Sequence, residues 1–233
     1  MPGTIVTDVP RPDEGGVAAL RGYGVATVHE AMGRVGSLGP ELRPIQQGVT
    51  IAGPAVTALC WPGDNLMIHA AVEQCSRGDV LVVATASPAT HGMFGDLFAT
   101  ALMHRGVRGV VVDAGVRDTA TLRELGFPAW SRYVSAEGTV KATAGSVNMP
   151  VVLAGQQVRA GDVVVADDDG VVVVRRERVA ETVRASAARA EREDAARAAF
   201  SQGELGLDRY GLRQRLADLG VGYGAWADIP EAQ

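Results

Sequence analysis

The chain has 233 residues, 47% of them hydrophobic, which is enough for one domain of ordinary size with a packed core. No apolar run approaches the about 18 residues of a membrane-spanning helix, and the N-terminus lacks the basic and then apolar pattern of a signal peptide. The net charge of -5 argues against a nucleic-acid-binding protein, which needs a basic face. We therefore expect a cytoplasmic protein without a membrane or nucleic-acid partner.

The cysteine content agrees with that expectation. Cys60 and Cys75 are the only two cysteines in the chain. So few cysteines are typical of a reducing compartment, where both serve as small buried apolar residues more often than as a disulfide.

The chain up to residue 125 alternates between helical and strand patterns. A surface segment runs through Pro12. After it, the pattern predicts helices over residues 17–34, 65–74, 96–105 and 118–125, and strands over residues 49–59, 80–84 and 110–113. Gly33 and Gly36 end the first helix, and Gly53–Pro54 suggests a bulge or a sheet edge in the first strand. This alternation indicates a layered α/β domain.

The remainder of the chain predicts a hairpin and then a helical extension. Strands over residues 162–166 and 171–174 flank Asp167–Gly170, which suits a tight turn. Residues 177–200 are rich in Ala, Arg and Glu, a composition that favours one long helix, and Gly203 stops it before a glycine-punctuated tail and another short helix. We therefore divide the chain into a core of residues 1–176 and an extension of residues 177–233. The long helix has few large side chains, so we expect it to pack on a neighbouring subunit, and truncation before Val179 to cost both activity and assembly.

Several familiar motifs are absent. His29–Glu30 is followed at position 33 by glycine instead of the second histidine of a zinc-protease helix, and Gly22–Gly24 lacks the third glycine of a dinucleotide fingerprint. A phosphate-binding loop and a nucleophile elbow are also missing. The four histidines show no convincing ligand spacing, so we expect surface or packing roles for them.

Two acidic residues open helices directly after glycine-rich loops. Asp96 follows Gly92–Gly95, and Asp118 follows Gly115–Arg117. Each aspartate by itself suits a helix N-cap. Because the two helices belong to consecutive α/β units, however, both loops should lie at the edge of the sheet where ligands gather. The two aspartates offer the oxygen ligands that magnesium prefers, Arg117 offers a fork for a carboxylate, and helix N-termini attract anions. The combination describes a site for a small oxo-acid.

The spacing of these residues resembles a known family. Twenty residues separate Asp96 from Arg117–Asp118, as in the class II pyruvate aldolases of the RraA-like superfamily, which are named after the regulator of ribonuclease activity A. Those aldolases act on 4-hydroxy-4-methyl-2-oxoglutarate or 4-carboxy-4-hydroxy-2-oxoadipate. The resemblance covers nearly the whole chain and includes five further segments: Thr27–Arg34, Pro62–Asn65, Gly138–Thr143, Ala166–Gly170 and Gly206–Asp208.

The resemblance implies a swivelling αββα domain that forms homotrimers or homohexamers with active sites at subunit interfaces. Carried over by position, Asp118 would bind a divalent cation, Mg²⁺ or Mn²⁺, and Asp96 would hold one of its waters. The loop of Gly95, Asp96, Leu97 and Phe98 would contact the substrate, and Arg117 would bind its pyruvyl group.

The resemblance also implies a catalytic glutamate from the neighbouring subunit's C-terminal helix. Glu193 is the best match and Glu191 is the alternative, while a solvated helix face is an equally good account of either. Glu30 and Lys141 stand in family-like motifs and are further candidates for the lining of the site.

The implied activity is cleavage of a 4-hydroxy-2-oxo acid to pyruvate plus pyruvate or oxaloacetate. Oxaloacetate decarboxylation is the expected side reaction, since both reactions pass through a pyruvate enolate. One alternative is a non-catalytic ribonuclease-inhibitor protein of the same superfamily; the extension and both aspartates favour the enzyme. The other is a Schiff-base aldolase, for which Lys141 is the only lysine. The physiological oxo-acid, the metal, and trimer or hexamer stay open at this stage.

Overall fold

The computed structural model describes residues 3–226. Their contacts divide the chain into two compact units that meet between Ala187 and Ala188, within helix α5 (Val179–Ser201). Each unit is described by itself. The division of the sequence at residues 176 and 177 stays a prediction, and residues 227–233 of the proposed extension lie outside the described residues.

The first unit is built on a central group of parallel strands. Strands β3 (Ile51–Cys60), β4 (Val80–Thr85), β6 (Gly109–Val116) and β7 (Ala129–Val134) are neighbours in this order. Valine-rich runs form β4 and β6, and these strands are buried on both faces, as in other parallel sheets. The short strands β1 (Thr4–Ile5), β8 (Ser146–Val147) and β2 (Arg43–Pro44) extend the sheet at its two sides.

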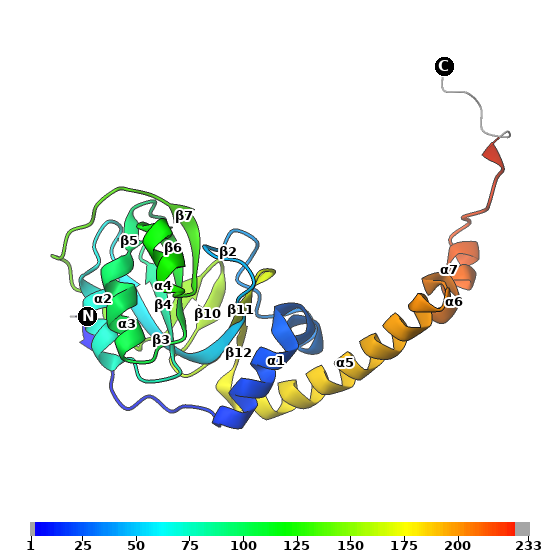
Figure 1. Cartoon of the computed structure of the whole chain (residues 1–233), viewed down its shortest axis with the longest axis horizontal. Coiled ribbons are helices and arrows are strands. Elements are labelled where there is room, and N and C mark those ends of the chain that lie inside the picture. The colour runs from blue at the N-terminus through cyan, green and yellow to red at the C-terminus, as the bar shows by residue number, and fades with distance from the viewer. Residues whose placement is uncertain (1–2, 227–233) are drawn as a thin grey trace, which may run out of the picture. The chain divides into compact units, whose positions relative to one another are not determined.

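Three helices cover one face of this sheet (Figure 1). They are α2 (Leu66–Gln74), α3 (Asp96–His104) and α4 (Thr119–Leu125). Alternate residues of β4, Leu81 and Val83, point into this layer and join one hydrophobic cluster with Phe94, Leu102 and Phe127.

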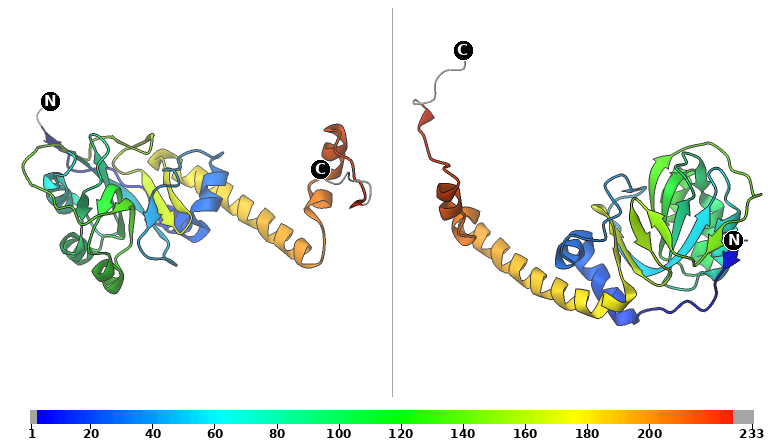
Figure 2. Two further views of the ribbon diagram at one scale, coloured as in Figure 1. Left: turned by 90° about the horizontal axis from the view of Figure 1, so that it is seen from above. Right: turned by 180° about the vertical axis from the view of Figure 1, so that it is seen from behind.

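A hairpin and one further helix cover the opposite face. Val80 and Val82 of β4 pack towards the hairpin of β11 (Val163–Asp167) and β12 (Gly170–Val174). A two-stranded sheet of β9 (Val151–Leu153) and β10 (Gln156–Val158) adds to this side. Helix α1 (Glu14–Ala31) lies against the hairpin in each view of Figure 2. The layers are therefore helices, sheet, sheet and helix, which confirms the predicted α/β class and the predicted hairpin.

Strand β3 connects the two sheets by changing its partner strand along its length. Residues Ile51 to Pro54 pair with β11 in antiparallel register, and Ala55 to Cys60 pair with β4 in parallel register. Gly53–Pro54 therefore precedes a change of partner within one continuous strand. Among the described residues β11 is the one strand that pairs with Ile51 to Pro54, so this stretch is a sheet edge, and its register with β11 is unbroken. Gly53 is required because a β-carbon there would collide with the carbonyl oxygen of Gly78.

Helix α1 differs from the continuous helix over residues 17–34 that the sequence predicts. It begins at Glu14 and is interrupted at Gly24, whose backbone is non-helical with φ of 76° and ψ of 171°. The break frees the amide of Val25, which donates a hydrogen bond of 2.8 Å to the Asp167 carboxylate at the tip of the hairpin. Asp167 thereby caps the second half of α1, an interaction between segments that no local pattern can reveal.

The second unit, described from Ala188 to Trp226, holds the end of α5 and the short helices α6 (Gly206–Arg209) and α7 (Leu212–Asp218). Its large apolar side chains are mostly exposed, among them Leu205, Tyr210, Leu219, Tyr223 and Trp226. Such a short unit buries too little apolar surface to be stable alone. No helix between residues 3 and 226 is both long and apolar enough to cross a membrane.

Both cysteines are free and buried in the first unit, as the sequence indicates. Burial raises the pKa of the Cys60 and Cys75 thiols to about 12, since a thiolate would lose its hydration there. Neither thiol is a nucleophile at neutral pH.

Candidate functional site

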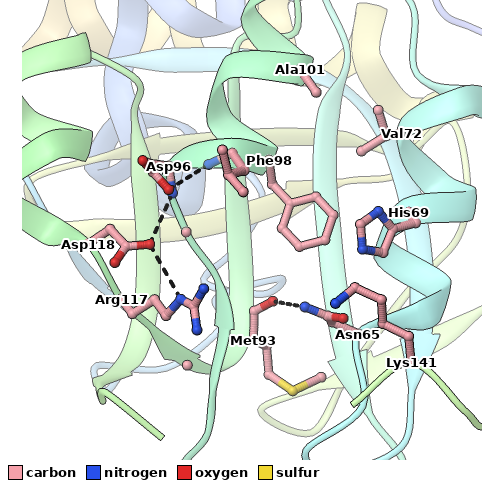
Figure 3. A pocket seen from close by; sticks show the side chains of 13 residues that line it. Asn65, His69, Val72, Met93, Asp96, Phe98, Ala101, Arg117, Asp118 and Lys141 are labelled. Carbon is pink, nitrogen blue, oxygen red and sulfur yellow. Dashed lines mark hydrogen bonds and ion pairs between the residues drawn. The ribbon is translucent and has the colours of Figure 1, made fainter. Parts of the chain in front are cut away.

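A cavity of about 220 Å³ opens beside the carboxyl ends of strands β5 and β6. Figure 3 shows its walls. One wall carries the charged residues Asp96, Arg117 and Asp118; the remaining lining residues are Asn65, His69, Val72, Gly92, Met93, Gly95, Leu97, Phe98, Ala101 and Lys141. The first unit alone supplies all of them.

A short strand that the sequence does not reveal brings the two aspartates together. Strand β5 (Gly92–Phe94) pairs in parallel with the end of β6, so that Gly92 stands opposite Gly115 and Phe94 opposite Val116. The amide of Arg117 donates a hydrogen bond of 2.9 Å to the carbonyl of Phe94. The chain after β5 therefore runs beside the chain after β6.

Asp118 does not act as an ordinary helix cap. It occupies the N-cap position of α4, but its side chain makes no capping hydrogen bond, and its φ of 56° places it in the left-handed region. Its Oδ2 atom lies 3.4 Å from the amide nitrogen of Asp96 and 3.4 Å from Nε of Arg117. A strained backbone that aims a carboxylate into a cavity is typical of a functional residue.

Asp96 is not the cap of α3 either. Gly95 holds the N-cap position, and Asp96 is the first helical residue, whose Oδ1 accepts a hydrogen bond of 2.8 Å from the amide of Leu97. The sequence left open that each aspartate serves only to cap a helix. The structure shows that capping explains the position of neither side chain.

Gly95 permits the close approach of the two loops. A β-carbon at this position would collide with Oδ2 of Asp118 and crowd the Arg117 side chain. The φ of Gly95 is -152°, which any residue can adopt, so the requirement for glycine is one of space.

The opposite wall carries polar residues to which the sequence assigned no such place. Asn65 is buried; its Nδ2 donates to the carbonyl of Met93 at 3.3 Å, and its Oδ1 has no hydrogen-bond partner among the described residues. His69, which the sequence indicated as a surface or packing residue, lines the cavity with its ring 4.5 Å from that of Phe98. Partial burial, and then the nearby Lys141 charge, lower the pKa of His69, so its imidazole is neutral at pH 7.

The other candidates from the sequence lie in different places. Leu97 stands at the cavity with its side chain largely exposed, and Lys141 lines the wall near Asn65. Glu30 pairs with Arg34 at 3.0 Å and is not a lining residue.

Glu193 and Glu191 belong to the second unit. Glu193 forms an ion pair of 2.8 Å with Arg189 one helical turn earlier, and Glu191 is exposed. The role of a glutamate from α5 stays a prediction.

The residues of the charged wall suit a magnesium or manganese ion. Residues 3–226 contain no group of three or more His, Cys, Asp and Glu side chains that could hold a metal, which is the usual requirement for catalytic zinc. Magnesium needs only one or two carboxylates because it retains several waters. The two hydrogen-bond and ion-pair contacts of Asp118 are long, which leaves its oxygens open for such an ion.

Fold and site together define a layered α/β protein with a cavity lined by charged residues at the carboxyl ends of parallel strands. Residues 25–173 match the family model of the RraA-like proteins, described as Aldolase/RraA. The chain belongs to this family.

Two relatives carry the same name, "Putative 4-hydroxy-4-methyl-2-oxoglutarate aldolase". The protein from Halalkalibacterium halodurans is 29% identical over 158 residues, which is 68% of this chain and 75% of that protein. The protein from Burkholderia multivorans is 34% identical over 143 residues, which is 61% of this chain and 87% of that protein.

Solved structures show the same fold. RraAS2 of Streptomyces coelicolor, described as an unusual member of the RNase ES inhibitor RraA protein family, has a TM-score of 0.73 at 30% identity over 82% of this chain and 99% of that one. An uncharacterized protein from Pseudomonas syringae has a TM-score of 0.73 at 24% identity, covering 84% and 96% of the two chains.

Proposed function

We propose that this protein is a divalent-metal-dependent aldolase that cleaves a 4-hydroxy-2-oxo dicarboxylic or tricarboxylic acid and releases pyruvate. The observation that carries the proposal is the grouping of Asp96, Arg117 and Asp118 around one cavity, with neither aspartate serving as a helix cap. The names of the two relatives support the same reaction class.

The charged wall binds the pyruvyl end of the substrate in this proposal. Asp118 holds a magnesium or manganese ion, with Asp96 beside it. The ion, when bound, polarises the C2 carbonyl as a Lewis acid. Arg117, whose side chain is 45% exposed, donates two N–H groups to the carboxylate and keto oxygens.

The opposite wall binds the far end of the substrate. Lys141 contributes a cation and Asn65 lines the wall beside it, and Figure 3 shows both side chains directed to the same part of the cavity. We assign binding of the carboxylate on the C4 side of the substrate to Lys141. The two anionic ends of the substrate then lie against opposite walls of the cavity.

The chemistry breaks the C3–C4 bond. Asp96 removes the C4 hydroxyl proton through a water molecule, C4 becomes a carbonyl carbon, and the electron pair of the broken bond forms the enolate of pyruvate. Arg117 stabilises the negative charge that develops on the C2 oxygen, a contribution that can reach several kcal/mol in such sites. A proton from water then converts the enolate into pyruvate. Oxaloacetate, which loses CO₂ through the same enolate, is the expected second substrate.

The first prediction tests the metal. Asp118→Asn keeps the size of the side chain and tolerates the left-handed backbone, but it removes the charge that binds the ion. We expect loss of pyruvate release from 4-hydroxy-4-methyl-2-oxoglutarate in this variant, and in the wild type after chelation, with recovery of the wild type on addition of Mg²⁺ or Mn²⁺. Asp8→Asn is the matched control, because Asp8 also has a φ of 56° and does not line the cavity. Full activity in metal-free buffer would exclude this function.

The same assay separates the alternatives. A Schiff-base lysine needs a desolvated pocket, whereas Lys141 is exposed. A ribonuclease-inhibitor protein, as the description of RraAS2 suggests for that relative, would release no pyruvate from either oxo-acid. Assembly into a trimer or hexamer, with Glu193 of a neighbouring subunit at the site, is part of the proposal and is tested separately below.

A further inference from the structure

Asp64 is a buried carboxylate beside the cavity that the proposed chemistry does not use. Only 2% of this residue is exposed, and it precedes Asn65 in the segment Pro62–Asn65. It does not line the cavity. A buried charge has to be matched by hydrogen bonds, so the question is which groups it holds.

The carboxylate of Asp64 joins two separate segments. Its Oδ1 accepts a hydrogen bond of 2.9 Å from the amide of Leu66, in the first turn of α2. Its Oδ2 accepts hydrogen bonds of 2.8 Å from the amide of Ala142 and 2.6 Å from the amide of Thr143. Asp64 therefore ties the start of α2 to the loop that carries Lys141.

The backbone forms a second tie immediately before Lys141. The amide of Val140 donates to the carbonyl of Gly63 at 2.9 Å, and the amide of Asn65 donates to the carbonyl of Val140 at 3.0 Å. Lys141 thus lies between this backbone bridge and the two amides held by Asp64.

Burial of side chains does not hold this loop, because residues 140–144 are all exposed. Besides the contacts of residues 63–65, the indole Nε1 of Trp61 donates to the carbonyl of Ala144 at 3.1 Å. The hydrogen bonds of the segment before α2 are therefore what sets the course of the loop.

The charge of Asp64 strengthens its hydrogen bonds. Burial raises the pKa of this carboxyl, but the amides of Leu66, Ala142 and Thr143 outweigh burial, and the pKa lies below its usual value. Asp64 is therefore ionised at neutral pH, and hydrogen bonds to a charged acceptor are stronger than neutral ones.

We propose that Asp64 is a positioning residue, which fixes the Lys141 loop against the start of α2 so that Lys141 and Asn65 face the same end of the substrate. This inference rests on the proposed function, in which Lys141 binds the carboxylate on the C4 side. Asp64 itself touches no substrate and acts through the loop.

The test compares Asp64→Asn with Lys141→Ala. An amide at position 64 keeps one acceptor oxygen and places an NH₂ group against the backbone amides on the other side, so the bridge between the loop and the start of α2 is broken. We expect each variant to raise KM for 4-hydroxy-4-methyl-2-oxoglutarate about tenfold, the loss of roughly one charge-assisted contact, with kcat changed less. The double variant should be no worse than Lys141→Ala alone, because the two changes remove the same contact.

Pyruvate provides a substrate that lacks the distal carboxylate. Exchange of its methyl protons in D₂O, followed by NMR, should proceed at the wild-type rate in Asp64→Asn. Asp79→Asn is the matched control: Asp79 is fully buried and accepts from the amide of Ser76 at 2.8 Å, but it pairs with Arg11 away from the cavity. It should lower the melting temperature without changing KM.

Two results would overturn the proposal. One is an unchanged KM in Asp64→Asn, and the other is a KM effect that adds in full to that of Lys141→Ala. If the wild type neither cleaves the oxo-acid nor exchanges pyruvate protons, the proposed function fails. Amide hydrogen exchange then tests only whether Asp64 holds the Lys141 loop. Faster exchange of the Ala142 and Thr143 amide hydrogens in Asp64→Asn, and not in Asp79→Asn, supports a loop held by Asp64. Equal exchange rates in the two variants refute that role.

Discussion

The backbone of Asp118 illustrates what a single residue contributes here. A left-handed conformation costs a residue with a β-carbon about 1–2 kcal/mol, although aspartate tolerates it better than most. The helix gains no capping hydrogen bond in return. We infer that the strained backbone of Asp118 is needed to place its carboxylate at the cavity. Substitutions of neighbouring residues should therefore lower kcat more than they lower the free energy of unfolding.

Arg117 is the first residue-scale test of this view. Arg117→Lys keeps the positive charge and loses the planar fork. If the guanidinium acts mainly on the developing enolate, kcat should fall about 10²–10³-fold for both aldol cleavage and oxaloacetate decarboxylation. Steady-state kinetics on both substrates is the measurement, and circular dichroism checks the fold.

Arg123→Lys is the control for that change. Arg123 lies on α4, donates to the carbonyl of Ile45 at 2.9 Å, and does not line the cavity. Its kinetics should match those of the wild type. A rise in KM with normal kcat in Arg117→Lys would mean that Arg117 binds the ground state and the transition state equally and has no special role in the transition state.

Gly95 is the second residue-scale test. A methyl group there must displace the Asp118 carboxylate, while the extended backbone of Gly95 accepts alanine without strain. We expect Gly95→Ala to lower kcat at least tenfold and to weaken activation by Mg²⁺, with a change in unfolding free energy of about 1 kcal/mol or less. Magnesium titration of the activity, beside urea denaturation, distinguishes the two effects, and wild-type magnesium dependence would contradict the geometry.

At the scale of elements, short pieces of structure set the site. Strand β5 has three residues, and it aligns the Asp96 loop with the Asp118 loop. Helix α1 is similarly defined by a distant residue, since Asp167 on the hairpin caps its second half after the break at Gly24.

The capping contact gives an element-scale prediction. Asp167→Ala leaves the amide of Val25 without its acceptor, and loss of a helix cap costs about 1–2 kcal/mol. We expect that decrease in unfolding free energy by urea denaturation, with kcat and KM unchanged, because Asp167 is not one of the residues that line the cavity. Asp169→Ala, a change of the exposed turn residue two positions later, should have a smaller effect. Equal losses in both variants would show that the turn matters and the cap does not.

At the scale of the whole molecule, the described part of the second unit exposes several large apolar side chains, which in other proteins mark interaction sites when they are contiguous. We expect another copy of the chain to cover them. Truncation before Val179, the change suggested by the sequence, would also damage the first unit, because Val179 is buried in the cluster of α1 and the hairpin. A chain that ends at Ala187 removes the second unit alone.

The truncated chain should lose assembly and activity together. Light scattering after size-exclusion chromatography should give a trimer or hexamer for the full chain and a smaller species for the truncated one. Pyruvate release should fall with it, since Glu193 is removed. Refutation would come from a truncated chain that is a fully active monomer.

Local patterns along the chain were enough to predict several features of the fold and the site. Valine-rich runs such as residues 80–84 predicted buried strands, and the acidic residues after glycine-rich loops in consecutive α/β units predicted a site at one sheet edge. The order of motifs also identified the family. The helix boundaries in this region were close, with α3 and α4 within one residue of the predicted limits.

The remaining features depend on contacts that form only in the folded chain. The pairing of β5 with β6, the change of partner after Gly53–Pro54 and the break in α1 depend on contacts between distant segments, and so does the presence of Asn65 and His69 in the cavity wall. A local pattern reports the periodicity with which a segment can bury its own side chains. It does not show which distant segment packs against that element. Positions that depend on one long-range hydrogen bond, or on the space around one glycine, can therefore be recognised only in the folded chain.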